Sequence, residues 1–389
     1  MELGLYNDHR TLKTFTAPRR NTLVIGAPQT GKTTLLTRLV LDDIHNGLPV
    51  TYIDPSGTAI EDILSRIPKD RQQDVLLIDP SRQPFALNIF ANISPDKREM
   101  FASTVLETVK GVWGYENMPT PVLDQYLRAT LHTALTVSGT TFLSLKFLLT
   151  SKPYRKELLS SVSDLVIKDF WSDFDTLTDK EKRQDIASTI NKLRAFLFSL
   201  PVRNCLDQKT NALSFKDKIV LVSLRTRELG KENASLLGAL ILSLLYIEDN
   251  PQTLYIDGGN FGTAILGTLL TSCPNLTTVV AVQFLAQMRE DFKPALLGGV
   301  QNIVTLRTSN PDADYLRPYL NIRHGDLGTN ELARFEAYAC IDGLTTTLTL
   351  PEHLYPETHQ AKKIRARCLS QCTAPLNTLE KRIARFINV

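Results

Sequence analysis

The strongest constraint on this chain is a stretch near its start, NTLVIGAPQTGKTTLLTRL, which runs from residue 21 to residue 39. An apolar run predicts a buried strand, a G-x-x-x-x-G-K-T motif follows it directly, and regularly spaced leucines then predict a helix. A phosphate-binding loop needs this context, because backbone N–H groups and a helix N-terminus must converge on the anion. The predicted phosphate-contacting residues are Gly26, Ala27, Pro28, Gln29, Thr30, Gly31, Lys32, Thr33 and Thr34.

Two side chains of this loop carry specific chemistry. Lys32 is expected to reach the β- and γ-phosphates of a nucleoside triphosphate, and the Thr33 hydroxyl is expected to ligate Mg²⁺. The alternative is a glycine-rich loop followed by an ordinary surface lysine. The agreement between motif and context favours the phosphate-binding loop.

Composition predicts a folded protein with more than one domain. The chain has 389 residues, of which 43% are hydrophobic, and a formal net charge of +3, so any DNA contact is expected to be local. Five scattered cysteines predict reduced thiols and a cytoplasmic location. The N-terminal segment is polar, and the longest apolar stretch, residues 234–247, is too short to cross a bilayer, so we expect neither a signal peptide nor an intrinsic membrane span.

The order of predicted elements indicates an α/β fold with a mostly parallel sheet. Long amphipathic patterns at residues 96–214, with charged loops such as 175–183, predict an all-helical insertion into an α/β domain formed by residues 1–95 and 215–389. A hairpin is predicted around Asp342-Gly343, and residues 1–20 are left open between an edge strand and adenine contacts. Besides the strand before the P-loop, strands are predicted at residues 49–54, 75–79, 218–225, 253–257, 277–283 and 302–307.

A P-loop also needs an acid at the end of a neighbouring buried strand, because Mg²⁺ must be held opposite Thr33. Asp257, at the end of Leu-Tyr-Ile-Asp, fits this requirement best. Asp54 and Asp79 also end apolar strands and remain competitors. A strand-end aspartate is often only a turn former.

Taken in order, these motifs resemble the type IV secretion and conjugation coupling proteins (TraG-like) of the HerA/FtsK superfamily. The resemblance runs from about residue 22 to residue 350. It implies a RecA-like P-loop ATPase core, ATP and Mg²⁺ as ligands, a hexameric ring, DNA contacted through its backbone, and a secretion, conjugation or packaging machine as partner. It rests on the P-loop, Asp-Pro-Ser-Gly after the second strand, the helical insertion, Val-Ser-Leu before a long apolar helix, Ile-Asp257, Val-Gln283-Phe-Leu-Ala-Gln, and Leu-Arg307-Thr-Ser-Asn-Pro-Asp-Ala.

The resemblance also implies catalytic roles for three residues. Asp257 matches the Mg²⁺-coordinating acid, Gln283 the residue that senses the γ-phosphate, and Arg307 an arginine that acts on a neighbouring subunit's phosphate. Two alternatives stay open: Gln283 caps a helix, or Arg307 forms a salt bridge with Asp312 or Asp314.

Two departures from the family pattern concern hydrolysis. The family places a water-polarising glutamate after the strand-end aspartate, where this chain has Gly258, and many members carry an arginine where it has Ser272-Cys273-Pro274. Loss of both predicts ATP binding with slow hydrolysis, because positioned water and charge neutralisation supply most of the catalysis. Asn260, Glu61 or a residue of the next subunit are the possible substitutes.

Three classes of function are consistent with these observations. The first is an ATP-driven DNA translocase, and the second is a hydrolysis-deficient, ATP-bound switch or structural subunit of such a machine. A signalling GTPase or small-molecule kinase is third, but the guanine-reading N-K-x-D motif is absent. The basic helical tail predicted at residues 360–389 is either a DNA contact or a solvated helix face.

Overall fold

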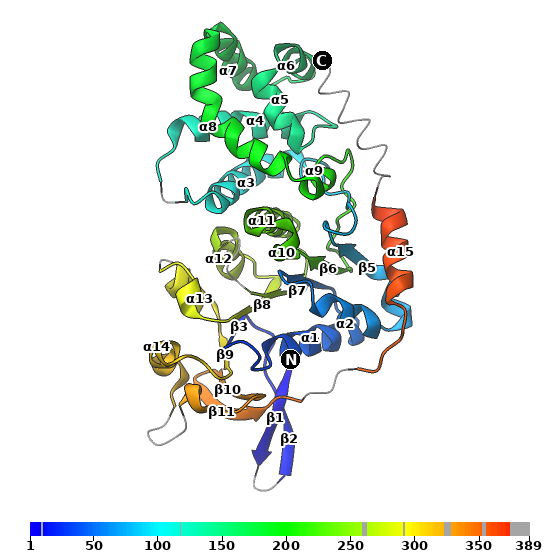
Figure 1. Ribbon diagram of the computed structural model, residues 1–389, viewed down its shortest axis with the longest axis vertical. Coiled ribbons are helices and arrows are strands. Elements are labelled where there is room, and N and C mark those ends of the chain that lie inside the picture. Colours follow the sequence, from blue (N-terminus) through cyan, green and yellow to red (C-terminus); the bar gives the residue numbers. More distant parts are fainter. Residues whose placement is uncertain are drawn as a thin grey trace. The chain divides into compact units, whose positions relative to one another are not determined.

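The computed structural model describes residues 1–8, 11–116, 118–258, 263–290, 292–322, 328–351 and 355–373. The chain forms two compact units, each built from separate stretches of sequence (Figure 1). Unit 1 contains residues 1–77, 215–223 and 248–366; unit 2 contains residues 78–214, 224–247 and those from 367 on. The domain boundaries predicted from the sequence, at residues 95/96 and 214/215, stay a prediction.

Unit 1 is organised around one sheet with the strand order β2-β1-β11-β10-β9-β3-β8-β7-β4-β6-β5. The residues of β3, β4 and β6 are all buried, as expected for parallel strands covered on both faces. The predicted α/β class with a mostly parallel sheet is confirmed. The strands of the parallel part are, in spatial order, β9 (Asn302–Thr305), β3 (Thr22–Ile25), β8 (Leu276–Val282), β7 (Gln252–Asp257), β4 (Val50–Asp54) and β6 (Ile219–Ser223). β5 (Val75–Ile78) lies next to β6 at the end of the sheet.

Antiparallel strands extend the sheet beyond β9. β10 (Glu336–Ile341) and β11 (Leu344–Thr349) form the predicted hairpin. Its turn residues Asp342 and Gly343 have positive φ values of 50° and 78°, as a tight two-residue hairpin turn requires. β1 (Glu2–Asp8) pairs with β11, and β2 (Thr11–Thr16) is the edge strand, so the N-terminal segment does supply an edge strand.

Helices cover both faces of the parallel strands. Figure 1 shows α1 (Lys32–His45) and α2 (Ala59–Arg66) on one side, and α12 (Thr263–Ser272) and α13 (Phe292–Gly299) on the other. Among the described residues, the remaining helices of unit 1 are η1 (Lys69–Asp74), η3 (Leu285–Gln287), α14 (Asn310–Leu320), η4 (Thr329–Glu331) and the first part of α15 (Ala361–Cys372).

Unit 2 is mainly helical. Its core includes the fully buried aromatic residues Phe101, Phe142, Trp171 and Phe196. Its described helices are η2 (Pro95–Lys97), α3 (Arg98–Val112), α4 (Pro121–Thr136), α5 (Phe142–Thr150), α6 (Lys152–Leu159), α7 (Leu165–Thr176), α8 (Asp179–Leu197), α9 (Leu200–Leu206), α10 (Thr226–Leu229) and α11 (Lys231–Glu248).

One sequence prediction in unit 2 was wrong. The charged segment at residues 175–183 was expected to be a loop, but α8 already begins at Asp179. Thr178 and Glu181 form a capping box in which each side chain bonds to the other residue's backbone N–H. Charge alone misled the prediction, because charged residues are good helix formers once a cap satisfies the first N–H groups.

Two further predictions concern the whole chain. All five cysteines are buried and none forms a disulfide. In the described stretches, no helix combines the length and the apolar character needed to cross a bilayer.

The predicted basic tail is described only in part. Four of its basic residues lie on α15, namely Lys362, Lys363, Arg365 and Arg367, and three lie outside the described residues, namely Lys381, Arg382 and Arg385.

Candidate nucleotide-binding site

Four adjacent strands of unit 1 bring the predicted site residues to one edge of the sheet. β9, β3, β8 and β7 are parallel neighbours, so their carboxyl ends lie side by side. Ligands of open α/β sheets bind at this kind of edge. The P-loop follows β3, Asp257 ends β7, Gln283 follows β8, and Arg307 follows β9.

The P-loop owes its path to close packing as well as to its glycines. Gly31 has a φ of 118°, and a Cβ at this position would lie 2.7 Å from Phe335 Cδ1. A Cβ at Gly26 would lie 2.8 Å from Leu306 Cβ. Phe335 N donates a hydrogen bond to Thr30 O at 3.1 Å. Contacts within unit 1 therefore hold the loop in shape, and both motif glycines are also required for packing.

Lys32, Thr33 and Asp257 converge behind this loop. Thr33 Oγ1 donates to Asp257 Oδ2 at 2.7 Å, and Lys32 Nζ donates to Ala27 O at 2.7 Å. The Lys32 side chain is only 6% exposed. A hydroxyl, an ammonium and a carboxylate at a helix N-terminus are the groups that hold a phosphate and its Mg²⁺ ion.

Burial sets the electrostatics of this cluster. Burial lowers the pKa of Lys32, and the nearby Asp257 charge opposes this shift. Burial also raises the pKa of Asp257, against the hydrogen bond from Thr33 and with a further contribution from the Asp54 charge. Burial therefore disfavours the charged forms of both groups, as is common at functional sites.

Tyr52 completes this cluster, and the sequence analysis did not single it out. Its side chain is fully buried in β4, its hydroxyl donates to Asp257 Oδ2 at 3.4 Å, and Thr37 of α1 hydrogen-bonds to it. A signal was present, because the tripeptide Tyr-Ile-Asp occurs at residues 52–54 and again at residues 255–257. The two copies lie in register on the adjacent strands β4 and β7, with Tyr52 beside Tyr255.

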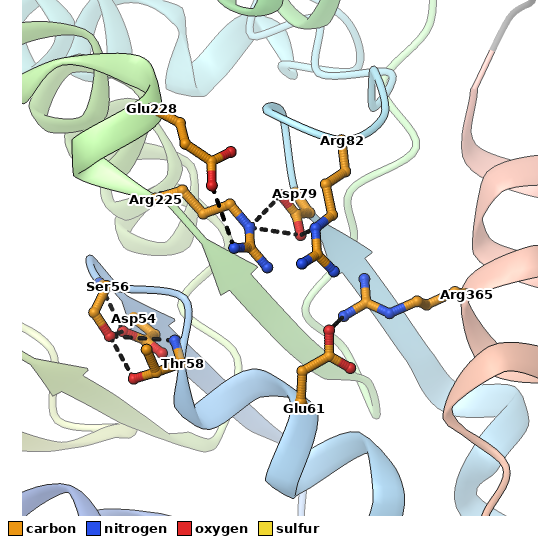
Figure 2. A network of polar contacts seen from close by, with 9 residues as sticks. All are labelled: Asp54, Ser56, Thr58, Glu61, Asp79, Arg82, Arg225, Glu228 and Arg365. Carbon is orange, nitrogen blue, oxygen red and sulfur yellow. Dashed lines mark hydrogen bonds and ion pairs between the residues drawn. The ribbon is translucent and has the colours of Figure 1, made fainter.

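The competing acid Asp54 accepts hydrogen bonds from the turn that directly follows it. Its Oδ1 accepts hydrogen bonds from Ser56 N at 2.8 Å and Ser56 Oγ at 2.7 Å (Figure 2). Its Oδ2 accepts one from Ala59 N at 2.9 Å. The side chain is buried. Asp54 therefore stabilises the start of α2, as the turn-former alternative expects.

The other competitor, Asp79, lies in unit 2 and is fully buried. Arg225 Nε lies 3.2 Å from each of its carboxylate oxygens, and Arg82 Nε lies 3.8 Å from Oδ2 (Figure 2). Its charge is compensated by two guanidinium groups. These contacts favour Asp257 over both competitors, although its role as a metal ligand stays a prediction.

Gln283 and Arg307 are both exposed beside the P-loop. Gly26 N donates to Val282 O at 3.2 Å, which places Gln283 next to the start of the loop. The described residues do not support the capping alternative, because the short helix that follows is preceded by Phe284 and has no side-chain cap.

The salt-bridge alternative for Arg307 is also not formed among the described residues. Asp314 lies 3.8 Å from Arg317, and Asp312 Oδ1 accepts a hydrogen bond from Leu285 N at 3.2 Å. Both predicted roles, phosphate sensing and action on a neighbour, stay predictions.

Gly258 occupies the position of the expected glutamate. Its φ is 117°, a conformation that side chains rarely adopt, while a Cβ would lie 3.6 Å from Pro55 Cγ, an ordinary contact. The backbone conformation, more than space, therefore disfavours a glutamate here. Of the proposed substitutes, Asn260 lies outside the described residues, and Glu61 forms an ion pair with Arg365 (Figure 2).

Comparison of whole structures places this fold among known ones. The bacterial conjugative coupling protein TrwBdeltaN70 is similar with a TM-score of 0.62 at 16% identity, over 92% of this chain and 91% of that chain. The chain has a RecA-like P-loop ATPase fold. VirB4 of Thermoanaerobacter pseudethanolicus has a TM-score of 0.64 at 13% identity, over 90% of this chain and 96% of that chain.

A further structure of TrwB, in complex with ADP and Mg²⁺, has a TM-score of 0.60 at 16% identity and covers 88% of both chains. The sequence matches no protein-family profile and no curated protein. At these identities the likeness to TrwB and VirB4 concerns the fold. It confirms the fold that the sequence resemblance to coupling proteins implied.

Proposed function

We propose that this chain binds ATP and Mg²⁺ and uses the nucleotide in a conjugation or secretion machine. The observation that carries the proposal is the convergence of Lys32, Thr33 and Asp257 at the carboxyl edge of a RecA-like sheet. The structures of TrwB with ADP and Mg²⁺, and with a non-hydrolysable ATP analogue, support these ligands by analogy of fold. The donor set also fits them, since Mg²⁺ prefers oxygen ligands.

Each site residue has a role in this proposal. The P-loop backbone and Lys32 bind the phosphates, and Thr33 and Asp257 hold Mg²⁺. Gln283 contacts the γ-phosphate, and Arg307, which is exposed, acts on the nucleotide of a neighbouring subunit. The bound ion supplies charge neutralisation at the phosphates.

The most specific form of the proposal is a DNA translocase. In this form the chain assembles as a hexameric ring, contacts the DNA backbone, and works in the cytoplasm, where a partner recruits it to a membrane machine. The likeness of fold to a conjugative coupling protein and to VirB4 supports this form.

A second candidate is a nucleotide-bound switch that does not hydrolyse ATP. The left-handed backbone at Gly258 favours it, because no carboxylate follows Asp257 to orient the attacking water. In this case ATP binding controls assembly of the machine, and turnover is negligible.

Steady-state ATP turnover, measured with and without DNA, separates the two candidates. A motor requires DNA-stimulated turnover that falls about 100-fold or more in Lys32→Ala, because the P-loop lysine stabilises the transferring phosphate. A switch predicts negligible turnover in the unchanged protein and a gain in Gly258→Glu. Gly258→Ala is the matched control, since it imposes the same backbone strain without a carboxylate.

Particle mass measured with an ATP analogue and DNA tests the ring. A hexamer supports the translocase. A monomer under these conditions contradicts it, whereas a monomer that binds nucleotide leaves the proposed ligands intact.

A further inference from the structure

Unit 2 contains a cavity of about 400 Å³, and none of the residues that line it belongs to the nucleotide site. Three chain segments line it, residues 88 and 90–93, residues 135–140 and residues 209–211, together with Arg98 at the start of α3. Asn88 joins two of these segments, because its Nδ2 donates to Thr140 O at 2.8 Å and to Lys209 O at 3.2 Å. The cavity is therefore built on a buried, hydrogen-bonded frame.

The charged residues that line this cavity are all positive. Arg98 and Lys209 line it, and no aspartate or glutamate does. Within the described part of the chain neither Arg98 nor Lys209 belongs to an ion pair. Arg98 and Lys209 therefore give the cavity a positive lining that no lining carboxylate neutralises, and an anion in the cavity would compensate this charge.

We propose that this cavity binds the phosphate group of a nucleotide-sized ligand. A phosphate offers several acceptor oxygens to a guanidinium fork, an ammonium and the nearby Ser138 hydroxyl. Both polar residues, such as Asn92 and Thr136, and apolar ones, such as Phe90, complete the lining, and the volume lies in the range of small-molecule sites. The ligand is either a free nucleotide or one nucleotide of a single strand.

Equilibrium dialysis of the full chain tests this site. Lys32→Ala serves as the parent, to weaken phosphate binding at the P-loop, and the probes are inorganic phosphate, thymidine monophosphate and a five-nucleotide oligothymidylate. Adding Arg98→Gln and Lys209→Gln should weaken binding of all three at least about tenfold, since two charge-assisted contacts are lost. Tighter binding of the oligonucleotide identifies a strand, and equal binding identifies a free nucleotide.

The matched control adds Arg128→Gln and Lys168→Gln, which remove two exposed cations of unit 2 outside the cavity. It should bind the probes as the parent does. An equal loss in this control, or a parent that binds none of the probes, overturns the proposal.

A second, independent observation concerns Tyr52, and it rests on the proposed function. Tyr52 and Thr33 both donate to Asp257 Oδ2, and Thr37, one helical turn after Thr33 on α1, hydrogen-bonds to Tyr52. If Thr33 turns toward a metal, Tyr52 remains as a direct donor to that carboxylate oxygen.

We infer that Tyr52 is a positioning residue, which orients the Asp257 carboxylate toward Mg²⁺. Partners of metal ligands fix ligand orientation, and their loss commonly reduces metal affinity by about 10–100-fold. Tyr255 provides a matched control. It is equally buried, lies beside Tyr52 on β7, and its hydroxyl donates to Asp43 Oδ2 of the same helix at 2.8 Å.

The test measures affinity for a fluorescent ADP analogue with Mg²⁺ and with EDTA. Tyr52→Phe should lose about tenfold in affinity with Mg²⁺ and nothing in EDTA, whereas Tyr255→Phe should change neither. Equal losses in both conditions would mean a merely structural role and overturn the inference, as would unchanged affinity with Mg²⁺. If the unchanged protein ignores the analogue in both conditions, the proposed function itself fails.

Discussion

The ends of β4 and β7 present the same tripeptide, Tyr-Ile-Asp, on adjacent strands in the same register. At the end of β4, the carboxylate of Asp54 accepts hydrogen bonds from Ser56 N and Ala59 N, which belong to the turn that follows the strand. At β7 the aspartate, Asp257, accepts hydrogen bonds from Thr33 of α1 and from Tyr52 of the neighbouring strand. One copy serves local structure, and the other faces the P-loop.

The difference arises from the residues that come after each aspartate. After Asp54, Pro55 and Ser56 form a tight turn that offers N–H and O–H donors to the carboxylate. After Asp257, Gly258 has a φ of 117°. Its backbone N donates to Ala281 O at 3.0 Å and not to the Asp257 carboxylate. The Asp257 carboxylate thus remains available to side chains of other elements, Thr33 of α1 and Tyr52 of β4. A strand-end aspartate takes its role from its neighbours.

The largest expected difference between the two copies is in nucleotide affinity. With Mg²⁺ present, Asp257→Ala should weaken binding of an ATP analogue about 10–100-fold, because a metal-holding carboxylate is removed. Asp54→Ala should bind within about twofold of the unchanged protein, since its partners are local. Fluorescence titration measures both, and an equal loss in the two variants would contradict the comparison.

For the free energy of unfolding, we expect the larger loss in Asp54→Ala and the smaller loss in Asp257→Ala. Asp54→Ala should lower the free energy of unfolding by about 1–3 kcal/mol, because the buried Ala59 N–H and the Ser56 donors lose their acceptor. Asp257→Ala should cost less, since burial already disfavours its charge. Urea unfolding monitored by circular dichroism checks this, and a larger loss for Asp257→Ala would refute it.

A smaller effect is expected at Gly258. Gly258→Ala should lower stability by about 1–2 kcal/mol, because its φ of 117° is unfavourable for a residue with a Cβ. Gly267→Ala in α12 is the control of opposite sign, since alanine favours helices and a Cβ there meets only Phe292, at 3.7 Å. Stability unchanged by Gly258→Ala would show that the backbone at this position adapts readily.

The smallest effect is a pH dependence at Asp257. Since its pKa is raised on folding, the folded state binds more protons than the unfolded state just above the ordinary aspartate pKa of about 3.9, so this group lowers stability as pH rises through that window. Asp257→Asn removes this contribution. The stability of the variant relative to the unchanged protein should therefore increase from about pH 3.5 to about pH 7, as measured by thermal unfolding. A variant that becomes relatively less stable as pH rises would contradict the assigned sign.

Much of the fold could be predicted because the pattern of apolar residues along the sequence reflects which positions are buried in strands and helices. The strands at residues 22–25, 50–54 and 252–257 are short apolar runs, and the hairpin at Asp342-Gly343 needs residues that tolerate positive φ. The start of α8 was missed because a capping box, a local hydrogen-bond pattern, outweighed the charged composition of its first turn.

The sequence by itself determined that a P-loop joins a buried strand to a helix, since the motif and its flanks specify that local geometry. Only the tertiary structure decided which of three strand-end aspartates faces Thr33, because all three follow similar apolar runs and differ in their partners across space. It also revealed Tyr52 and the conformation of Gly258. Strand order and contacts between distant side chains come from packing across the sheet, and one-dimensional spacing does not encode them.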